Sequence, residues 1–93
     1  MTTTEIKKKI NHDSMWIAAK FPSGANYKFK VDRNGERLEI AFSNNTAELA
    51  KQSRIFLKWM QFRKGENNEQ RFDRLEKLTK ECKSGKELIH LMS

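Results

Sequence analysis

The stretch YKFKVDRNGERLEIAF, residues Tyr27 to Phe42, decides the fold of this chain. Apolar and polar residues alternate on both sides of Asn34-Gly35, a dipeptide that favours the two-residue type I′ turn because both central positions need φ > 0. Folding the stretch about that turn predicts a β-hairpin with one apolar face and one charged face. The cross-strand pairs predicted in this way are Val31 with Leu38, Phe29 with Ile40, Tyr27 with Phe42, Asp32 with Arg37, and Lys30 with Glu39.

The residues just before the hairpin predict a further strand. Met15 to Phe21 also alternates, and the turn-forming segment 22–26 connects it directly to the hairpin. We therefore expect a three-stranded antiparallel β-meander. Its strands would cover about 15–21, 27–33 and 36–42.

The N-terminal residues have the features of a short helix. Thr2 and Glu5 have the spacing of a capping box, and Ile6 lies one helical turn before Ile10. These features predict a helix over residues 3–11. A helix of this length is marginal by itself, so it would have to dock through its isoleucines.

The second half of the chain predicts helices. After Asn45, a candidate N-cap, apolar residues recur at helical spacing, which predicts a long helix over 46–64 that packs on one face of the sheet. Gly65 would end it, and two further helices are expected over 69–83 and 86–92. The sequence thus predicts a single small α+β domain over residues 1–93.

The composition limits the classes of function. The chain has a formal net charge of +7, and the excess is concentrated in residues 1–12 and 45–64. A single cysteine, Cys82, cannot form an internal disulfide, and no apolar run approaches the length of a membrane span. We therefore expect a cytoplasmic protein with an anionic partner and no membrane association.

Signatures of catalysis are absent from the sequence. There is no phosphate-binding glycine loop, nucleophile elbow or zinc-protease motif. His12 and His90 lie near opposite ends of the chain, and with one cysteine they do not form a recognisable zinc set. We expect a protein that is not an enzyme and that uses no cofactor, metal or small-molecule substrate.

Basic residues predict nucleic-acid binding through three groups. A stripe on the 46–64 helix would contact phosphates, and a polar sheet face with one tryptophan among cations resembles surfaces that stack single strands or that enter a major groove. A lysine triplet near the N-terminus would add to them. The stripe is Lys51, Arg54 and Lys58; the sheet group is Trp16, Lys28, Lys30 and Arg37; and the triplet is Lys7, Lys8 and Lys9.

Each group also has an ordinary structural interpretation. The helix stripe could be a solvated face, and the lysine triplet could be a solubilising arm. Trp16 could be a core residue that the N-terminal helix covers through Ile6 and Ile10.

A second hypothesis makes the protein an interaction partner of another protein. Ile55, Trp59 and Phe62 form a second apolar stripe on the predicted long helix, and their residue types are common at binding hot spots. The chain would then be a small inhibitor or adaptor of the kind that phages and plasmids encode, docking on a larger host machine. Such a stripe could also form a homodimer.

Overall fold

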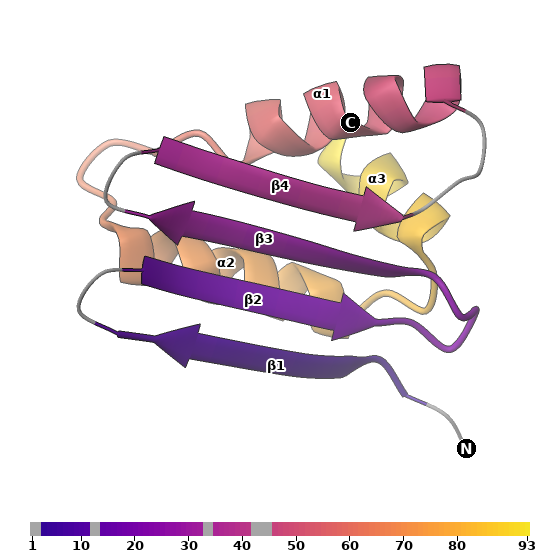
Figure 1. Ribbon diagram of the computed structural model, residues 1–93, viewed down its shortest axis with the longest axis horizontal. Coiled ribbons are helices and arrows are strands. Elements are labelled where there is room, and N and C mark those ends of the chain that lie inside the picture. The colour runs from indigo at the N-terminus through magenta and orange to yellow at the C-terminus, as the bar shows by residue number, and fades with distance from the viewer. Residues whose placement is uncertain (1–2, 12–13, 33–34, 42–45) are drawn as a thin grey trace.

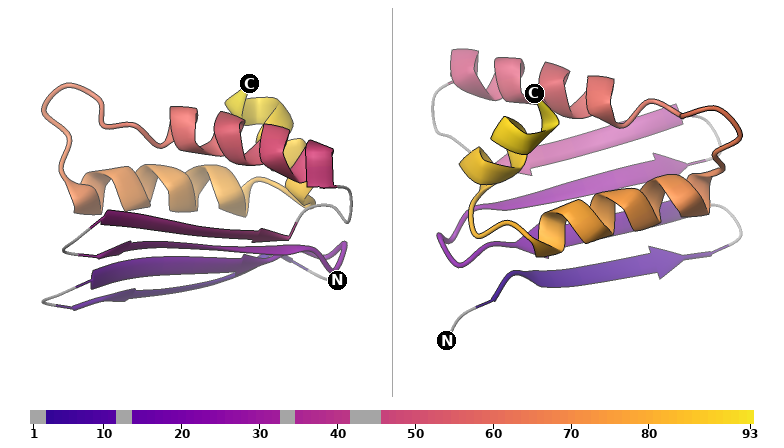
Figure 2. Two further views of the ribbon diagram at one scale, coloured as in Figure 1. Left: turned by 45° about the horizontal axis from the view of Figure 1, so that its top comes forward. Right: turned by 180° about the vertical axis from the view of Figure 1, so that it is seen from behind.

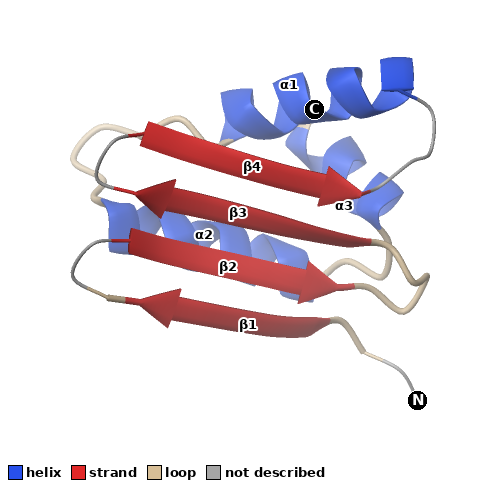
Figure 3. Ribbon diagram, in the orientation of Figure 1, coloured by secondary structure: helices blue, strands red, loops and turns tan. Residues whose placement is uncertain are grey.

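A computed structural model describes residues 3–11, 14–32, 35–41 and 46–93 of the chain. It has two layers, a four-stranded antiparallel sheet and three helices packed on one of its faces (Figure 1). The strands, in the spatial order β1-β2-β3-β4, are Glu5–Ile10, Ser14–Lys20, Asn26–Asp32 and Gly35–Ala41. The helices are α1 (Thr46–Trp59), α2 (Asn68–Lys80) and α3 (Gly85–Met92). The expected α+β class is confirmed: among the described residues the four strands precede the three helices along the chain, and Figure 3 distinguishes the sheet from the helices by colour.

The prediction of an N-terminal helix and a three-stranded sheet is wrong. Residues Glu5 to Ile10 form β1, which pairs antiparallel with β2 and makes the sheet four-stranded. A spacing of four residues, as between Ile6 and Ile10, fits one helical turn, but it also places both residues on the same face of a strand. The open edge of β2 decides between the two, because its unpaired backbone groups gain hydrogen bonds from a strand and none from a helix.

The predicted hairpin register is also wrong, by two residues. Phe29 lies opposite Leu38 and Lys30 opposite Arg37, whereas the Asn34-Gly35 turn would have placed them opposite Ile40 and Glu39. The pairing of Asp32 with Gly35 puts Gly35 in the strand, and the predicted turn itself lies partly outside the described residues. Because a two-residue shift leaves each side chain on its face, the apolar and charged faces are those expected.

The core lies between the sheet and the helices. Phe56 of α1 contacts the rings of Tyr27 and Phe29 at centroid distances of 5.3 and 5.6 Å, and Phe72 of α2 lies 5.7 Å from Phe29. The Tyr27 hydroxyl is 2.7 Å from the Thr79 hydroxyl oxygen, so its polar end is satisfied inside the core. Side chains of both α1 and α2, and not of one long helix alone, therefore pack on the apolar face.

Helix α1 ends at Trp59, so the prediction of a helix over 46–64 is too long. The carbonyls at this end accept hydrogen bonds from two arginines of α2: Trp59 from Arg74 (3.0 Å), Gln61 from Arg74 (3.2 Å) and Met60 from Arg71 (3.1 Å). Guanidinium groups at a helix C-terminus satisfy carbonyls without an intrahelical partner and interact favourably with the helix dipole. Gly65, the predicted stop, lies in the following loop at φ +75°.

The two remaining helices begin with side-chain caps. Asn67 and Gln70 form a capping box at the start of α2, and Ser84 accepts a hydrogen bond from the Glu87 amide at the start of α3. These helices correspond to the predicted segments 69–83 and 86–92, although α2 already ends at Lys80. The predicted cap of α1, Asn45, lies outside the described residues. No helix in the described ranges has both the length and the apolar character needed to cross a membrane.

Candidate nucleic-acid interface

One face of the sheet carries none of the three helices that the described residues form. The views in Figure 2 show α1, α2 and α3 together on the other side. Successive side chains of a strand point to opposite faces, and the buried, paired residues Ile17 and Phe29 mark the covered side. We call the other side the open face. Its described side chains are Glu5, Lys7 and Lys9 of β1; Ser14, Trp16, Ala18 and Lys20 of β2; Asn26, Lys28 and Lys30 of β3; and Arg37 and Glu39 of β4.

One of the rows of side chains that cross the open face contains three cations and a tryptophan. Its members, each paired with the next on the neighbouring strand, are Lys9, Trp16, Lys30 and Arg37. Within the described part of the chain, none of these three cations forms an ion pair with a carboxylate. Like charges directly opposite each other destabilise a sheet, so the pairing of Lys30 with Arg37 costs folding stability.

The open face is basic as a whole. Its described side chains comprise six cations and two carboxylates, a balance of +4 on a chain whose total is +7: Lys7, Lys9, Lys20, Lys28, Lys30 and Arg37 against Glu5 and Glu39. Most of these cations are largely exposed, and Lys30 is half-buried. A surface of one sign attracts anionic ligands and increases their rate of association.

Trp16 lies half-buried within this basic surface. The Lys28 ammonium nitrogen is 5.7 Å from the centroid of its ring, a cation–π contact. The alternative that an N-terminal helix covers Trp16 through Ile6 and Ile10 is wrong, because both isoleucines belong to a strand and lie on the covered side. Trp16 is therefore outside the hydrophobic core.

The open face contains a hollow over β2 and its neighbouring strands. Its floor is Ala18, the next residue of β2 on this side after Trp16, and its neighbours in register are Lys7 and Lys28. Asn26 and Glu39 also line this hollow, whose volume is about 350 Å³. The small alanine side chain thus leaves space between cations and hydrogen-bonding groups.

The three lysines of the N-terminal triplet do not share one surface. Lys7 and Lys9 lie on the open face, whereas Lys8 lies on the covered side and reaches α2. Its ammonium is 3.3 Å from a Glu76 carboxylate oxygen and 3.6 Å from one of Asp73. The hydrogen bond with Glu76 raises the pKa of Lys8 above its usual value. Lys8 therefore joins β1 to α2 and is separated from the open face.

The predicted helix stripe belongs to the other layer of the molecule. Lys51, Arg54 and Lys58 are exposed on α1, which lies among the helices beside β4. Their spacing is that of a solvated helix face, and no aromatic ring lies within cation–π distance of them in the described structure. The stripe thus lacks the aromatic partner that the open face has.

The apolar stripe of the second hypothesis is partly covered within the chain. Ile55 and Trp59 pack against the core, and the Arg74 guanidinium carbon lies 4.3 Å from the centroid of the Trp59 ring. Phe62 lies beyond the end of α1 and is 53% exposed, with the Arg71 guanidinium carbon 4.1 Å from its ring centroid. The three side chains therefore do not form one continuous helix face.

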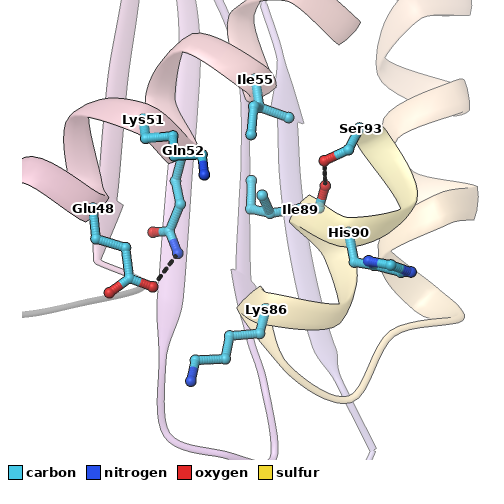
Figure 4. A pocket seen from close by; sticks show the side chains of 8 residues that line it. All are labelled: Glu48, Lys51, Gln52, Ile55, Lys86, Ile89, His90 and Ser93. Carbon is cyan, nitrogen blue, oxygen red and sulfur yellow. Dashed lines mark hydrogen bonds between the residues drawn. The ribbon is translucent and has the colours of Figure 1, made fainter.

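A second hollow of about 270 Å³ lies between α1 and α3 (Figure 4). Gln52 is buried there and donates a hydrogen bond to Glu48, while Lys51 and Lys86 line the same space. No three His, Cys, Asp or Glu side chains in the described ranges gather closely enough to hold a metal ion. Burial raises the pKa of the Cys82 thiol to about 11, so this thiol is protonated at neutral pH.

Comparison of the chain with protein-family models, with curated proteins and with solved structures found no match.

Sequence reasoning placed Trp16, Lys28, Lys30 and Arg37 on one face and also predicted Lys7 and Lys9 as phosphate contacts. It assigned these two lysines to a helix or a solubilising arm, however, and not to a strand of the same sheet. The signal that could have found them is the alternation in EIKKKI, where two isoleucines and one lysine occupy one face and a glutamate and two lysines occupy the other.

Proposed function

We propose that this protein binds nucleic acid through the open face of its sheet, without catalysing a reaction. The observation that carries the proposal is the row of Lys9, Trp16, Lys30 and Arg37 on a face without helices. Placing two cations opposite each other costs stability, and a phosphate between them would remove that cost. Trp16 adds a ring on which a base can stack.

The predicted helix stripe on α1 is the competing contact surface for the same function. It carries three cations, as the row on the open face does. Replacing the three cations of either surface therefore changes the net charge by the same amount, and the effects on binding can be compared directly. The open face is favoured because its cations surround an aromatic ring, while those of α1 do not.

The proposal is tested with two triple variants of matched charge. One replaces Lys9, Lys30 and Arg37 with Gln, and the other replaces Lys51, Arg54 and Lys58 with Gln. Binding of fluorescently labelled DNA and RNA is measured by anisotropy between 50 and 300 mM salt (about sixfold, enough to define a slope). The open-face variant should lose affinity, and its slope of log K against log salt should fall by about 2, because three contacts at about 0.7 each are lost on a single strand.

The outcomes separate the two surfaces. If only the α1 variant loses slope, the helix stripe is the contact surface and the open-face assignment is wrong. If the parent protein binds no nucleic acid at low salt, the proposed function itself is wrong. Circular dichroism of both variants verifies that the fold is intact.

Protein binding through Ile55, Trp59 and Phe62 has less support. Both rings of this stripe, Trp59 and Phe62, contact largely buried arginines of α2 that are hydrogen-bonded to the end of α1, so a partner would have to displace contacts of the folded chain. The Lys28 side chain over Trp16, in contrast, is exposed.

A further inference from the structure

We propose that the ligand of the open face is a single-stranded nucleic acid, with one base stacked on Trp16 and the adjacent nucleotide in the hollow over Ala18. This inference rests on the proposed function and adds the class of ligand and the position of two nucleotides. Three features of the described residues support it: the width of the sheet, the position of Trp16 and the lining of the hollow.

The width of the sheet disfavours the groove of a duplex. Neighbouring strands lie about 4.8 Å apart, so the outer strands of a four-stranded sheet are about 14 Å apart before their side chains are counted. The major groove of B-DNA is about 12 Å wide and admits a helix or a two-stranded ribbon. A three-stranded sheet would be narrower, and the addition of β1 is what makes this face too broad.

The position of Trp16 suits an unpaired base. It lies in β2, one of the two inner strands, and its neighbours in register are Lys9 and Lys30. The bases of a duplex stack on one another inside the helix, whereas an unpaired base offers its ring face to an aromatic side chain. A base on Trp16 therefore brings a flanking phosphate within reach of a lysine on a neighbouring strand.

The hollow over Ala18 continues this path along β2. It has cations on both sides, Lys7 and Lys28, which suit a phosphate. Asn26 and Glu39 line it with an amide and a carboxylate, which can pair with the edge of a base that is not already paired. A volume of about 350 Å³ is at the lower end of the range for small-ligand pockets, which fits one nucleotide and not a duplex.

The first arm of the test measures affinity for a mixed-sequence single strand and for the same strand annealed to its full complement, at one salt concentration. The full chain should bind the single strand more tightly. Trp16→Leu should weaken single-strand binding about 5- to 150-fold, the range that stacking of one base implies, and should leave duplex binding unchanged. Trp16→Phe keeps an aromatic ring and should retain most of the affinity.

The second arm reports on contact directly. The chain has two tryptophans, so Trp59→Phe leaves Trp16 as the fluorescent reporter and Trp16→Phe leaves Trp59. Addition of single-stranded DNA should quench the emission of Trp16 and not that of Trp59. Ala18→Val fills the hollow without changing charge, and it should lower single-strand affinity several-fold.

The failures are distinguishable. Equal or tighter binding of the duplex, without quenching of Trp16, would overturn the single-strand inference and leave the basic open face as a duplex-binding surface. Single-strand binding that Trp16→Leu and Ala18→Val do not alter would overturn the assigned nucleotide positions. Absence of binding to either form would overturn the inference together with the proposed function.

Discussion

The two faces of one sheet use the same kinds of residue in opposite ways. On the covered face, Phe29 is fully buried among other aromatic rings, and Lys8 pairs with carboxylates of α2. On the open face, Trp16 lies half-buried, and Lys30 faces the cation of Arg37. The charged and aromatic residues of the covered face thus have their partners within the chain, whereas Lys9, Lys30 and Arg37 of the row on the open face form no ion pair with a carboxylate among the described residues.

The clearest contrast within this comparison is between adjacent lysines of β1. Lys8 and Lys9 are neighbours in sequence, but the strand directs them to opposite faces. Lys8 lies within 4 Å of two carboxylates of α2, and Lys9 lies beside Trp16. A position on a strand, more than the type of residue, decides whether a lysine is structural or available.

The largest expected effect compares the aromatic residues of the two faces. Phe29→Ala should lower the free energy of unfolding by about 3–5 kcal/mol, because it leaves a cavity among Tyr27, Phe56 and Phe72. Trp16→Ala should lower it by about 1 kcal/mol or less, because this ring is outside the core. Urea denaturation measures both. An equal loss for the two variants would show that Trp16 is a structural residue and not one outside the core.

The second prediction concerns the ion pair between Arg74 of α2 and Glu66, which lies in the helix layer. Hydrogen bonds from Arg74 lower the pKa of the Glu66 carboxyl to about 2, well below its value of about 4.3 in an unfolded chain. A lowered folded-state pKa contributes stability that is present above the unfolded pKa and is lost as the pH falls through the folded one. Stability should therefore decrease between about pH 5 and pH 2.

The matched variant for this prediction is Glu66→Gln. It should be less stable than the parent chain at pH 7, and the difference between the two should shrink towards pH 2 as the parent carboxylate is protonated. Denaturation at several pH values measures that difference. A difference independent of pH would show that the ion pair with Arg74 does not stabilise the fold.

The class of the fold could be predicted from the sequence because the hairpin and the helices have strong local periods. Alternation in β3 and β4 assigned Phe29 and Lys30 to opposite faces correctly even though the register was wrong, because a shift of two residues preserves the faces. The sequence could not distinguish a strand from a helix over residues 5–10. The spacing of four residues between Ile6 and Ile10 fits the period of a helix as well as that of a strand, and pairing with the edge of β2 selects the strand.

The end of α1 depended on contacts that are distant in sequence. Helical spacing continues past Trp59, but Arg71 and Arg74 of the next helix take the terminal carbonyls. No local pattern marks an arginine that will be buried beneath a helix end. The candidate surface could be predicted only in part for a similar reason. Trp16 and Lys30 lie on adjacent strands that the sequence predicts, whereas Lys9 lies beside Trp16 only because residues 5–10 form the strand β1.

The third prediction uses the adjacent lysines of β1 as a matched pair. Lys8→Ala should lower the free energy of unfolding by about 0.2–1 kcal/mol, the range for exposed ion pairs, and should leave nucleic-acid affinity unchanged apart from the general loss of one charge. Lys9→Ala should leave stability unchanged and weaken binding more than Lys8→Ala does. Denaturation and anisotropy on both variants measure the two effects. The reverse pattern would contradict the assignment of Lys9 to the ligand and of Lys8 to the fold.

The fourth prediction concerns a small change in stability whose sign distinguishes a binding residue from a structural one. Lys30→Glu places a carboxylate opposite Arg37, so a repulsive cross-strand pair becomes an attractive one, and stability should rise by about 0.2–1 kcal/mol. The same change removes two units of positive charge from the row beside Trp16, so nucleic-acid affinity should fall. A gain in stability together with a loss of binding is expected at a binding site for an anion, because its cations repel one another when no ligand is bound. If thermal unfolding shows a loss of stability, Lys30 contributes to the fold itself, and the open face differs less from the covered one than the register implies.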